Sequence, residues 1–517
     1  MPHYFSSNFT LGILGGGQLG KMLLTETRKF DISTKVLDPS ADAPCRIACN
    51  TFVQGALTDF DTVYNFGKDV DVLTIEIENV NVDALKKLQS EGVKVYPTPQ
   101  TIELIQNKAT QKQFYTTHNI PTAPFHRFES LTNLQQAVTN EQITLPFVWK
   151  SARFGYDGNG VKIVRQLPDL SLLPEGECIA ENLVPFAKEL AVIVARNVSG
   201  EATTYPVVEM EFHPEANQVE YVLCPARISE EIAQKARAIA VQVAQAFQVV
   251  GLLAVELFLT AEGEVLVNEV APRPHNSGHY SIEAAYTNQF EQHLRAILDL
   301  PLGNTDSKVA GVMVNLVGAE GYQGDVIYEN IEQILAMEGV TPHIYGKRET
   351  RPFRKMGHVT IVNKDIEKAR TIAEKVKQTI NYVYKDNNPA EPAFPTVERE
   401  LEFTRENTKD LVTNVVTNGQ WTATNGTVFT EVVSPTKPGY TADKAKVEAV
   451  NNVTEDTADI VETVVYSPET QKLTYTVIDD TTNTTLEDKK DLASGDSNSE
   501  VKPETQTTYD NIVASYE

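Results

Sequence analysis

Two acidic residues on neighbouring predicted strands have the types and spacing to hold a hard metal ion. Glu256 lies in the apolar run Leu252 to Leu259, and Glu269 lies in Val265 to Val270 with Asn268 beside it. A hairpin of these two runs places both carboxylates at one end, next to the amide. Mg²⁺ prefers carboxylate, water and phosphate oxygens, and Mn²⁺ is a second candidate. Apolar neighbours disfavour two solvated surface acids, so the pattern predicts a metal site that bridges nucleotide phosphates.

A glycine-rich loop follows Lys150, which ends an apolar run. Three glycines fall within Gly155 to Gly160, between two predicted strands. Glycine lets main-chain N–H groups approach phosphate oxygens closely, and the lysine adds positive charge. No Gly-Lys-Ser/Thr sequence follows, so this is not a Walker loop, and alone it is equally typical of a hairpin turn. With the acidic pair it predicts a nucleotide cleft, in which Glu181 and Glu189 are candidates for contacts with adenosine.

An earlier glycine-rich loop suggests a different ligand. Gly15, Gly17 and Gly20 match G-x-G-x-x-G between a predicted strand and a helix, and Asp38 ends the next strand. This is the fingerprint of a dinucleotide site, so an NAD(P)-dependent oxidoreductase is an alternative function. The physical content is more general, because a helix N-terminus attracts any phosphate or carboxylate. Gln18 adds an amide that either binds a polar ligand or stays exposed.

Composition excludes several classes of protein. The chain has 517 residues with 45 Lys and Arg against 70 Asp and Glu, for a net charge of −25, and 41% of its residues are hydrophobic. This acidic balance disfavours nucleic-acid binding, and no apolar run is long enough to cross a membrane. The N-terminus lacks the charged leader of a signal peptide, so we expect a cytoplasmic protein with free thiols at its four cysteines.

The elements that must position these residues change character along the chain. Between residues 11 and 96, short apolar runs alternate with helical patterns, which predicts a parallel sheet with crossover helices. Beyond it, the pattern predicts a mixed lobe and a β-rich unit with a final helix. The expected elements are strands 147–150, 161–164, 189–196, 205–211, 252–259, 265–270, 308–317 and 358–362, and helices 230–247 and 365–380.

From residue 381 onward, β-branched residues alternate with polar ones, which predicts an all-β, Thr-rich module. Residues 411–417 and 420–424 flank Asn418-Gly419 and predict a hairpin with a type I′ turn. Strands are expected at 461–466 and 473–479, and residues 488–506 are polar enough to form a linker. This part holds no His or Cys, so binding or spacing is a more suitable function for it than catalysis.

Three segments resemble one enzyme family. These are Val267-Asn268-Glu269-Val270-Ala271-Pro272-Arg273-Pro274-His275-Asn276-Ser277-Gly278-His279, the first glycine loop, and Gly155-Tyr156-Asp157-Gly158. On these motifs, residues 8 to 380 resemble the 5-(carboxyamino)imidazole ribonucleotide synthases, which are ATP-grasp ligases of purine (IMP) biosynthesis. The resemblance implies a homodimer in which ATP phosphorylates bicarbonate to carboxyphosphate and the carboxyl group passes to 5-aminoimidazole ribonucleotide, with release of ADP.

The resemblance also implies a fold of α/β and α+β type. A Rossmann-like domain is expected over residues 1–105, a two-lobed ATP-grasp domain over 106–305, and a small C-terminal domain over 306–380. The remainder contains Phe429-Thr430-Glu431-Val432-Val433-Ser434-Pro435, Pro438-Gly439-Tyr440-Thr441-Ala442-Asp443 and Asp459-Ile460-Val461-Glu462-Thr463-Val464-Val465-Tyr466. On these segments it resembles the mucin-binding repeats of bacterial adhesins, with a β module over 381–487 and a linker with the start of a further repeat over 488–517. This tail is expected to be non-catalytic and to bind glycoproteins.

Site roles follow from the same resemblance. Glu256 and Glu269 are implied as metal ligands, and Asp157, Lys347 and Arg354 as catalytic residues. The ribonucleotide pocket is implied to contain Gln18, Glu76, Tyr156 and Asn276. ATP contacts are implied for Lys108, Lys150, Gly155, Tyr156, Asp157, Gly158, Asn159, Gly160, Val161, Glu181, Asn182, Leu183, Val184, Glu189, His213, Asn268 and Glu269.

One position departs from the family pattern. Asn159 stands between two glycines where the family usually has a basic residue. Loss of this charge weakens anion binding, so we expect a raised substrate KM and a lowered KM in Asn159→Lys. The alternatives to a ligase are the NAD(P)-dependent oxidoreductase and a surface adhesion module with a passive N-terminal passenger. Nicotinamide binding would support the first, and mucin binding without ATP turnover the second.

Overall fold

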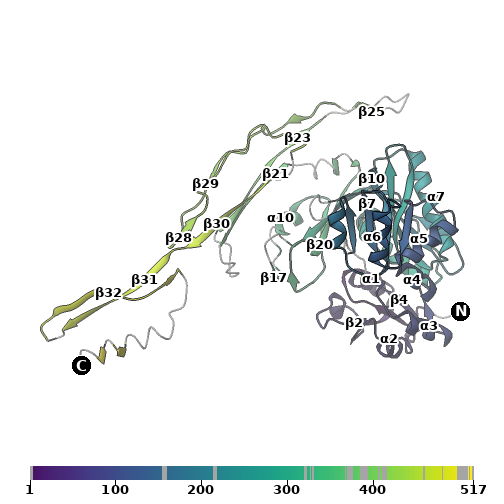
Figure 1. Cartoon of the computed structure of the whole chain (residues 1–517), viewed down its shortest axis with the longest axis horizontal. Helices are drawn as coiled ribbons and strands as arrows, with labels where there is room; N and C mark the ends of the chain where they lie inside the picture. The colour runs from purple at the N-terminus through teal and green to yellow at the C-terminus, as the bar shows by residue number, and fades with distance from the viewer. Residues whose placement is uncertain are drawn as a thin grey trace. The chain divides into compact units, whose positions relative to one another are not determined.

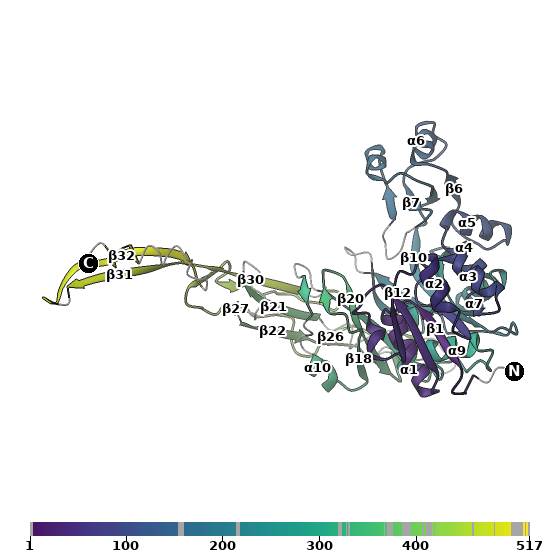
Figure 2. The same cartoon turned by 90° about the horizontal axis from the view of Figure 1, so that it is seen from below.

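The computed structural model divides the chain into two compact units, residues 1–369 and 370–517 (Figures 1 and 2). It describes residues 4–153, 160–212, 218–318, 323–326, 328, 331–366, 368–369, 376–384, 394–405, 408–409, 416–417, 419–457, 460–479, 481–497, 510–511 and 513–514. Within these ranges, no helix has both the length and the apolar character needed to cross a membrane.

The first unit begins with a five-stranded parallel sheet in the order β3-β2-β1-β4-β5, which confirms the predicted Rossmann-like arrangement. Its strands are β1 (Thr10–Leu14), β2 (Ser33–Asp38), β3 (Thr51–Gln54), β4 (Val72–Ile75) and β5 (Lys94–Val95). The helices between them and just after them are α1 (Gln18–Lys29), η1 (Pro44–Ile47), α2 (Phe60–Gly67), α3 (Val82–Ser90) and α4 (Pro99–Ile105). Strand β3 was not predicted, because this short edge strand has no fully buried residue to give an apolar pattern.

A four-stranded antiparallel sheet in the order β6-β9-β7-β8 forms the first lobe of the grasp. It contains β6 (Phe125–Phe128), β7 (Phe147–Ser151), β8 (Val161–Val164) and β9 (Cys178–Asn182), with α6 (Leu131–Thr139) and η2 (Leu167–Leu172). Helix α5 (Lys108–Thr117) leads into it. In Figure 2 this lobe, marked by β6, β7 and α6, projects from the rest of the unit.

The second lobe is built on a nine-stranded sheet in the order β15-β14-β10-β12-β13-β16-β20-β18, with β11 also paired to β10. The strands are β10 (Phe186–Arg196), β11 (Ala202–Thr204), β12 (Val208–Phe212), β13 (Val219–Cys224), β14 (Gly251–Thr260), β15 (Val265–Ala271), β16 (Ala310–Val317), β18 (Val340–Ile344) and β20 (Lys355–Asn363). Pairing of β13 with β16 joins the small C-terminal part of the first unit to this lobe in one sheet.

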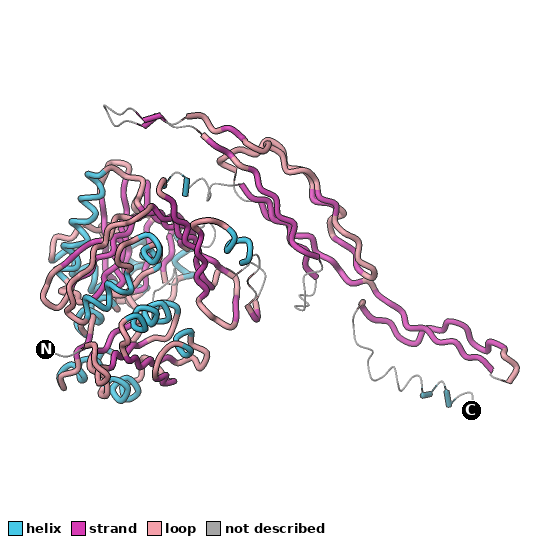
Figure 3. Tube along the Cα trace, turned by 180° about the vertical axis from the view of Figure 1, so that it is seen from behind, coloured by secondary structure: helices cyan, strands magenta, loops and turns pink. Residues whose placement is uncertain are grey.

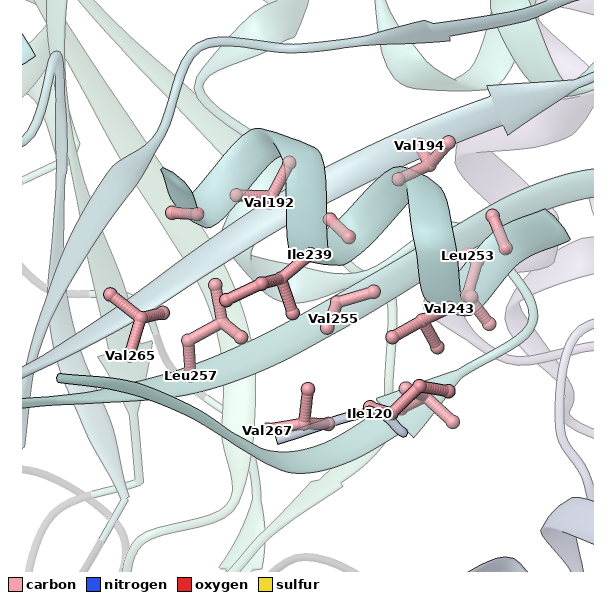
Figure 4. Packing of buried hydrophobic residues seen from close by; sticks show 14 of the residues in the cluster. Ile120, Val192, Val194, Ile239, Val243, Leu253, Val255, Leu257, Val265 and Val267 are labelled. Carbon is pink, nitrogen blue, oxygen red and sulfur yellow. The ribbon is translucent and has the colours of Figure 1, made fainter. Parts of the chain in front are cut away.

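Helix α7 (Glu230–Ala246) covers the nine-stranded sheet and forms the largest core (Figure 4). Ile239 and Val243 of the helix pack on Val192, Val255 and Leu257 of the strands. The remaining elements of the unit are η3 (Asn276–Gly278), α8 (Ser281–Ala284), α9 (Gln289–Ile297), β17 (Gly324–Asp325), α10 (Ile331–Ala336) and β19 (Glu349–Thr350). Apolar residues of α9 join the core under β1 and α1, which ties the first domain to the second lobe.

The predicted helix 365–380 is wrong from Val376 onward. Residues Val376–Tyr384 form strand β21, which pairs antiparallel with β22 (Phe394–Leu401) and parallel with β30 (Ile460–Pro468). β-branched and aromatic residues dominate this stretch, and pairing on both edges supplies hydrogen bonds that an isolated helical turn lacks. Strand β21 therefore belongs to the second unit.

The regular structure described in the second unit is mostly strand, and long loops connect the strands (Figure 3). Its main sheet has the order β22-β21-β30-β28, and β31 pairs with β32 in a long hairpin. The other strands form the pairs β23-β26, β24-β25 and β27-β29. Their bounds are β23 (Phe403–Thr404), β24 (Thr408–Lys409), β25 (Val416–Thr417), β26 (Thr422–Ala423), β27 (Val432–Val433), β28 (Tyr440–Ala442), β29 (Lys446–Val447), β31 (Thr470–Asp479) and β32 (Thr484–Asp496).

Two predictions for this unit are wrong. The strands on either side of Asn418-Gly419 do not pair with each other, because β25 pairs with β24 and β26 pairs with β23. Burial of Phe403 in a core that Trp421 and Ala423 also contact outweighs the local turn signal. Residues 488–496 are not a linker, since they lie in β32, where charged side chains are tolerated on an exposed strand.

Candidate active site

The predicted acidic hairpin is present. Glu256 of β14 and Glu269 of β15 are direct cross-strand partners, and the register shifts just after Glu256. Partners of this kind have Cβ atoms about 5 Å apart. The side chain of Glu269 is 44% exposed and that of Glu256 is 16% exposed, so a ligand can reach both carboxylates.

Burial and repulsion between carboxylates dominate the electrostatics of this pair. Burial, followed by the negative charges of Glu269 and Glu189, raises the pKa of Glu256. Burial and Glu269 likewise raise the pKa of Glu189 to about 7. Lys108 has the opposite effect on Glu269, because its Nζ lies 2.8 Å from Glu269 Oε2 and its charge lowers the pKa of that carboxyl. A divalent cation here would relieve the repulsion among the three carboxylates.

A histidine lies beside the acidic pair. His275 Nε2 lies 3.4 Å from Glu256 Oε1, and burial together with Arg273 and Lys355 lowers the pKa of His275 to about 3, so the ring is neutral. Among the described residues, no group of three or more His, Cys, Asp or Glu can hold a metal ion by itself. The residues therefore fit a Mg²⁺ ion that takes its remaining oxygens from phosphate and water.

A small pocket adjoins the acidic pair, between α5, the four-stranded lobe and β15. Lys150 donates to Asn268 Oδ1 at 2.9 Å, and its Nζ lies 2.9 Å from Glu181 Oε2. Three lysines line the pocket, which suits a polyanion. Its lining residues are Lys108, Gln111, Lys112, Lys150, Ile179, Glu181, Asn268 and Glu269.

Other residues that are predicted to contact the nucleotide are close in sequence to the residues that line this pocket. Asn182 ends β9, and Leu183 and Val184 connect it to β10, the strand that carries Glu189. Gly160 has a φ of 76° and its carbonyl accepts from Ser151 N at 2.8 Å, which closes the base of the β7–β8 loop ahead of Val161. The predicted residues Gly155, Tyr156, Asp157, Gly158, Asn159 and His213 lie outside the described residues.

The first glycine loop encloses a carboxylate. Glu76, directly after β4, accepts from Leu19 N at 3.1 Å through Oε1. A Cβ at Gly17 would lie 2.5 Å from Glu76 Oε1, and one at Gly15 would lie 2.7 Å from Oε2, so both glycines leave room for this side chain. Asp38 accepts from Gly16 N at 2.7 Å. The helix N-terminus thus already has an acidic partner, which disfavours a dinucleotide pyrophosphate there and with it the oxidoreductase alternative.

Burial raises the pKa of Glu76 to about 7, although the positive charge of Arg273 opposes the shift. Gln18 is the first residue of α1, at the same loop. Asn276, in η3, makes a reciprocal amide pair with Asn315 of β16, at 2.9 and 3.0 Å. The structure therefore holds the candidate ribonucleotide residues on three separate elements.

The predicted basic pair lies in the turn between β18 and β20. Lys347 donates to Lys355 O at 2.6 Å, and Arg354 donates to Glu349 O at 2.6 Å. Lys21 of α1 donates to Ile344 O at 2.9 Å, which fastens this turn to the first domain. The structure ties both predicted side chains to main-chain carbonyls of their own turn.

Sequence reasoning missed several ionisable residues near the site. Lys355 and His275 influence the acidic pair, Arg273 influences Glu76, and Lys112 lines the pocket. Arg273 and His275 lie within the family-like segment, so their position was a usable signal. Lys355 directly follows Arg354 of the predicted basic pair, so its position was a usable signal as well. Lys112 lies in a segment without a motif, and only the fold reveals its proximity.

Comparisons with known proteins agree with this architecture. The model of the ribonucleotide synthetase preATP-grasp domain matches residues 9–106, and that of the ATP-grasp domain matches residues 113–290. The phosphoribosylaminoimidazole carboxylase C-terminal domain matches residues 311–372, and the Muc B2-like domain matches residues 367–470. The predicted family resemblances are thereby confirmed for both parts of the chain.

Individual relatives cover the same region. The N5-carboxyaminoimidazole ribonucleotide synthase of Bacillus subtilis is 39% identical over 359 residues, which is 68% of this chain and 91% of that protein. The phosphoribosylaminoimidazole carboxylase of Saccharomyces cerevisiae is 38% identical over 386 residues, which is 72% of this chain and 66% of that protein.

Solved structures show the same likeness. The N5-carboxyaminoimidazole ribonucleotide synthetase of Thermotoga maritima matches with a TM-score of 0.65 and 43% identity, covering 71% of this chain and 96% of that one. The enzyme of Aspergillus clavatus, solved with ADP and 5-aminoimidazole ribonucleotide, matches with a TM-score of 0.65 and 34% identity, covering 70% of this chain and 96% of that one. Through its first unit, the chain belongs to the N5-carboxyaminoimidazole ribonucleotide synthase family of ATP-grasp ligases.

Proposed function

We propose that the chain uses ATP and bicarbonate to carboxylate 5-aminoimidazole ribonucleotide in purine biosynthesis, with release of ADP. The named activity of the Bacillus subtilis relative and the ligands of the Aspergillus clavatus structure support this substrate pair. The observation that carries the proposal is the cleft in which an acidic cross-strand pair adjoins a lysine-lined pocket. Phosphoryl transfer needs this combination of positioned cations and metal ligands.

Glu256 and Glu269 would hold Mg²⁺, with Mn²⁺ as a substitute. The ion would neutralise charge on the β- and γ-phosphates during transfer to bicarbonate. Lys108 and Lys150 line the pocket next to Glu269, so they are the candidates to contact phosphate oxygens. Asn268, bonded to Lys150, holds that ammonium at the mouth of the pocket.

The adenosine end would lie along Glu181, Asn182, Leu183, Val184 and Glu189. Main-chain groups of the segment between β9 and β10 can read the adenine edge, and Glu189 can accept from ribose hydroxyls. The glycine loop and His213 would complete the ATP site: Gly155, Tyr156, Asp157, Gly158, Asn159, Gly160 and Val161. Carboxyphosphate is labile in water, so the site must keep water away from it.

The ribonucleotide would bind between the first domain and η3. Glu76 and Gln18 would supply acceptor and amide groups at the first glycine loop. Asn276 of η3, whose amide is paired with Asn315, would supply a further amide. Tyr156 is the further candidate for this pocket. Asp157 would accept a hydrogen bond from the attacking amine and help to remove its proton.

Positive charge for the carboxylate intermediate would come from the small C-terminal part. Lys347 and Arg354 are the predicted pair, and the structure adds Lys355, whose charge already acts on Glu256 and His275. Fixed cations stabilise a developing oxyanion better than solvent does, because they need no reorganisation. In this proposal, the acidic residues of the second lobe hold the metal ion, and the basic residues at the turn before β20 stabilise the oxyanion.

The test is phosphate release from MgATP at fixed bicarbonate, with and without 5-aminoimidazole ribonucleotide. We expect release that depends on the ribonucleotide and falls at least a hundredfold in Glu269→Gln, because one metal ligand is lost. Glu103→Gln, which changes an exposed helix residue, is the matched control and should keep full activity. Phosphate release that does not depend on the ribonucleotide, or that is unchanged in Glu269→Gln, would reject the assignment.

For the second unit we propose a non-catalytic role in binding glycoproteins, supported by the Muc B2-like match. Retention of the purified chain on immobilised mucin tests it, and unchanged retention after deglycosylation of the mucin would contradict it. We also propose a cytoplasmic homodimer for the enzyme part. Sedimentation equilibrium at micromolar concentration tests the dimer, and a single monomeric mass would contradict it.

A further inference from the structure

A buried lysine that no functional role yet explains lies beside the nucleotide pocket. Lys112 of α5 is 2% exposed, and its Nζ lies 2.8 Å from Glu181 Oε1. It also donates to Thr122 Oγ1 at 2.6 Å, and Thr122 in turn donates to Val267 O at 2.7 Å. The ammonium group is therefore fixed between the first lobe and strand β15.

Glu181 lies between two lysines. One carboxylate oxygen faces Lys112 and the other lies 2.9 Å from Lys150 Nζ, while the side chain is only 3% exposed. Burial works to raise the pKa of Glu181, but the charges of Lys150 and Lys112 outweigh it and keep the pKa below its usual value. The carboxylate is therefore ionised and needs positive charge from its neighbours.

The charge balance of the pocket depends on Lys112. The lining holds three lysines against two glutamates, which leaves one positive charge to attract phosphate. Lys108 is already paired with Glu269. Without Lys112, the pocket would be neutral and Glu181 would have Lys150 as its remaining partner, which would hold that ammonium away from a ligand.

We propose that Lys112 is a positioning residue that binds the charge of Glu181 and so leaves Lys150 available to the nucleotide phosphates. The inference rests on the proposed ATP site. It assigns different tasks to two lysines of one pocket: Lys150 acts on the ligand, and Lys112 acts through Glu181. If Lys112 were only the counter-ion of a buried acid, its replacement would lower the stability of the protein but would not weaken ATP binding more than AMP binding.

The number of phosphates on the ligand separates the two roles. We would measure the Kd of AMP, ADP and ATP with Mg²⁺ by calorimetry at pH 7, where Lys112 is still mostly protonated because burial lowers its pKa only to about 8. In Lys112→Met we expect ATP binding to weaken about tenfold or more and AMP binding by no more than about twofold. Lys112→Arg keeps the charge and should restore most of the ATP affinity.

Lys29→Met is the control, because Lys29 and Arg295 also place two cations beside a buried carboxylate, that of Glu291, although Lys29 itself is exposed. It should leave all three nucleotide affinities unchanged. The double variant Lys112→Met/Glu181→Gln removes one charge of each sign and frees Lys150. Its ratio of ATP to AMP affinity should return to within about threefold of the parent value, as the pocket regains one positive charge.

Equal weakening of AMP and ATP in Lys112→Met, or no weakening, would overturn the inference. If Lys112→Met does not fold, the double variant decides, because it buries no unpaired charge; a tenfold lower ATP to AMP ratio in it would overturn the inference. Failure of the parent protein to bind MgATP would instead reject the proposed function, so the two failures are distinguishable.

Discussion

Replacement of Glu76 by Gln tests the electrostatics of the first glycine loop. In the folded protein the pKa of Glu76 is about 7 against an ordinary value of 4.5. The folded state therefore binds more protons than the unfolded chain between about pH 4.5 and 7, and this group lowers stability as the pH rises through that window. At about 1.4 kcal/mol per pKa unit, ionised Glu76 costs up to about 3 kcal/mol at pH 8.

Glu76→Gln removes this cost, so the substitution should increase the free energy of unfolding more at pH 8 than at pH 5. For a unit of 369 residues, an unfolding entropy of about 2.1 cal/mol/K per residue converts the difference of about 3 kcal/mol into about 4 °C. Calorimetric midpoints of parent and variant at both pH values measure it. Glu103→Gln, an exposed change on α4, should shift the midpoint equally at both values.

The same substitution should impair function. Gln cannot supply the charged acceptor that we propose for the ribonucleotide, so we expect KM for 5-aminoimidazole ribonucleotide to rise about tenfold or more with little change in KM for ATP. Equal midpoint shifts at pH 5 and pH 8 would refute the burial argument. An unchanged ribonucleotide KM would refute the substrate role of Glu76 and leave the burial argument intact.

Three further predictions concern other parts of the chain. Glu256→Gln should raise the melting temperature of the metal-free protein, because it removes repulsion with Glu269, yet abolish the further rise that MgADP gives; thermal melts with and without MgADP check both. Gly17→Ala should raise the ribonucleotide KM at least tenfold in steady-state assays with MgADP affinity unchanged, since the new Cβ would lie 2.5 Å from Glu76 Oε1. Val464→Ala, at a fully buried position of the second unit, should destabilise that unit by about 2 kcal/mol in urea unfolding and leave ATP turnover unchanged.

Local signals were sufficient for much of the fold. The parallel sheet follows from apolar runs that alternate with amphipathic helices, and the acidic hairpin follows from two strands joined by a short turn. Strand β21 was predicted as part of a helix, because it forms a strand only by pairing with β22 and β30, and β30 lies far along the chain. Similarly, the Asn418-Gly419 turn signal lost to a core around Phe403 and Trp421.

The site was predictable only as far as its motifs extend. Glu256, Glu269 and Lys150 stand in recognisable settings, so their side chains could be selected in advance. Lys112 stands in ordinary sequence, and its charge matters because folding brings α5 next to β7, β9 and β15. Lys355 follows Arg354 in the predicted basic segment, but only the fold shows that its charge acts on Glu256. Glycine spacing alone also could not show that the first loop accommodates the carboxylate of Glu76.

The pairing of β13 with β16 has a mechanical consequence. Main-chain hydrogen bonds run without interruption from β15, which carries Glu269, to β20, which begins with Lys355. Bending such a continuous sheet would strain many of these bonds at once, so we expect the acidic pair and the proposed basic residues to keep a fixed spacing. If the two lobes close around ATP, we expect the four-stranded lobe to move while the nine-stranded sheet stays fixed.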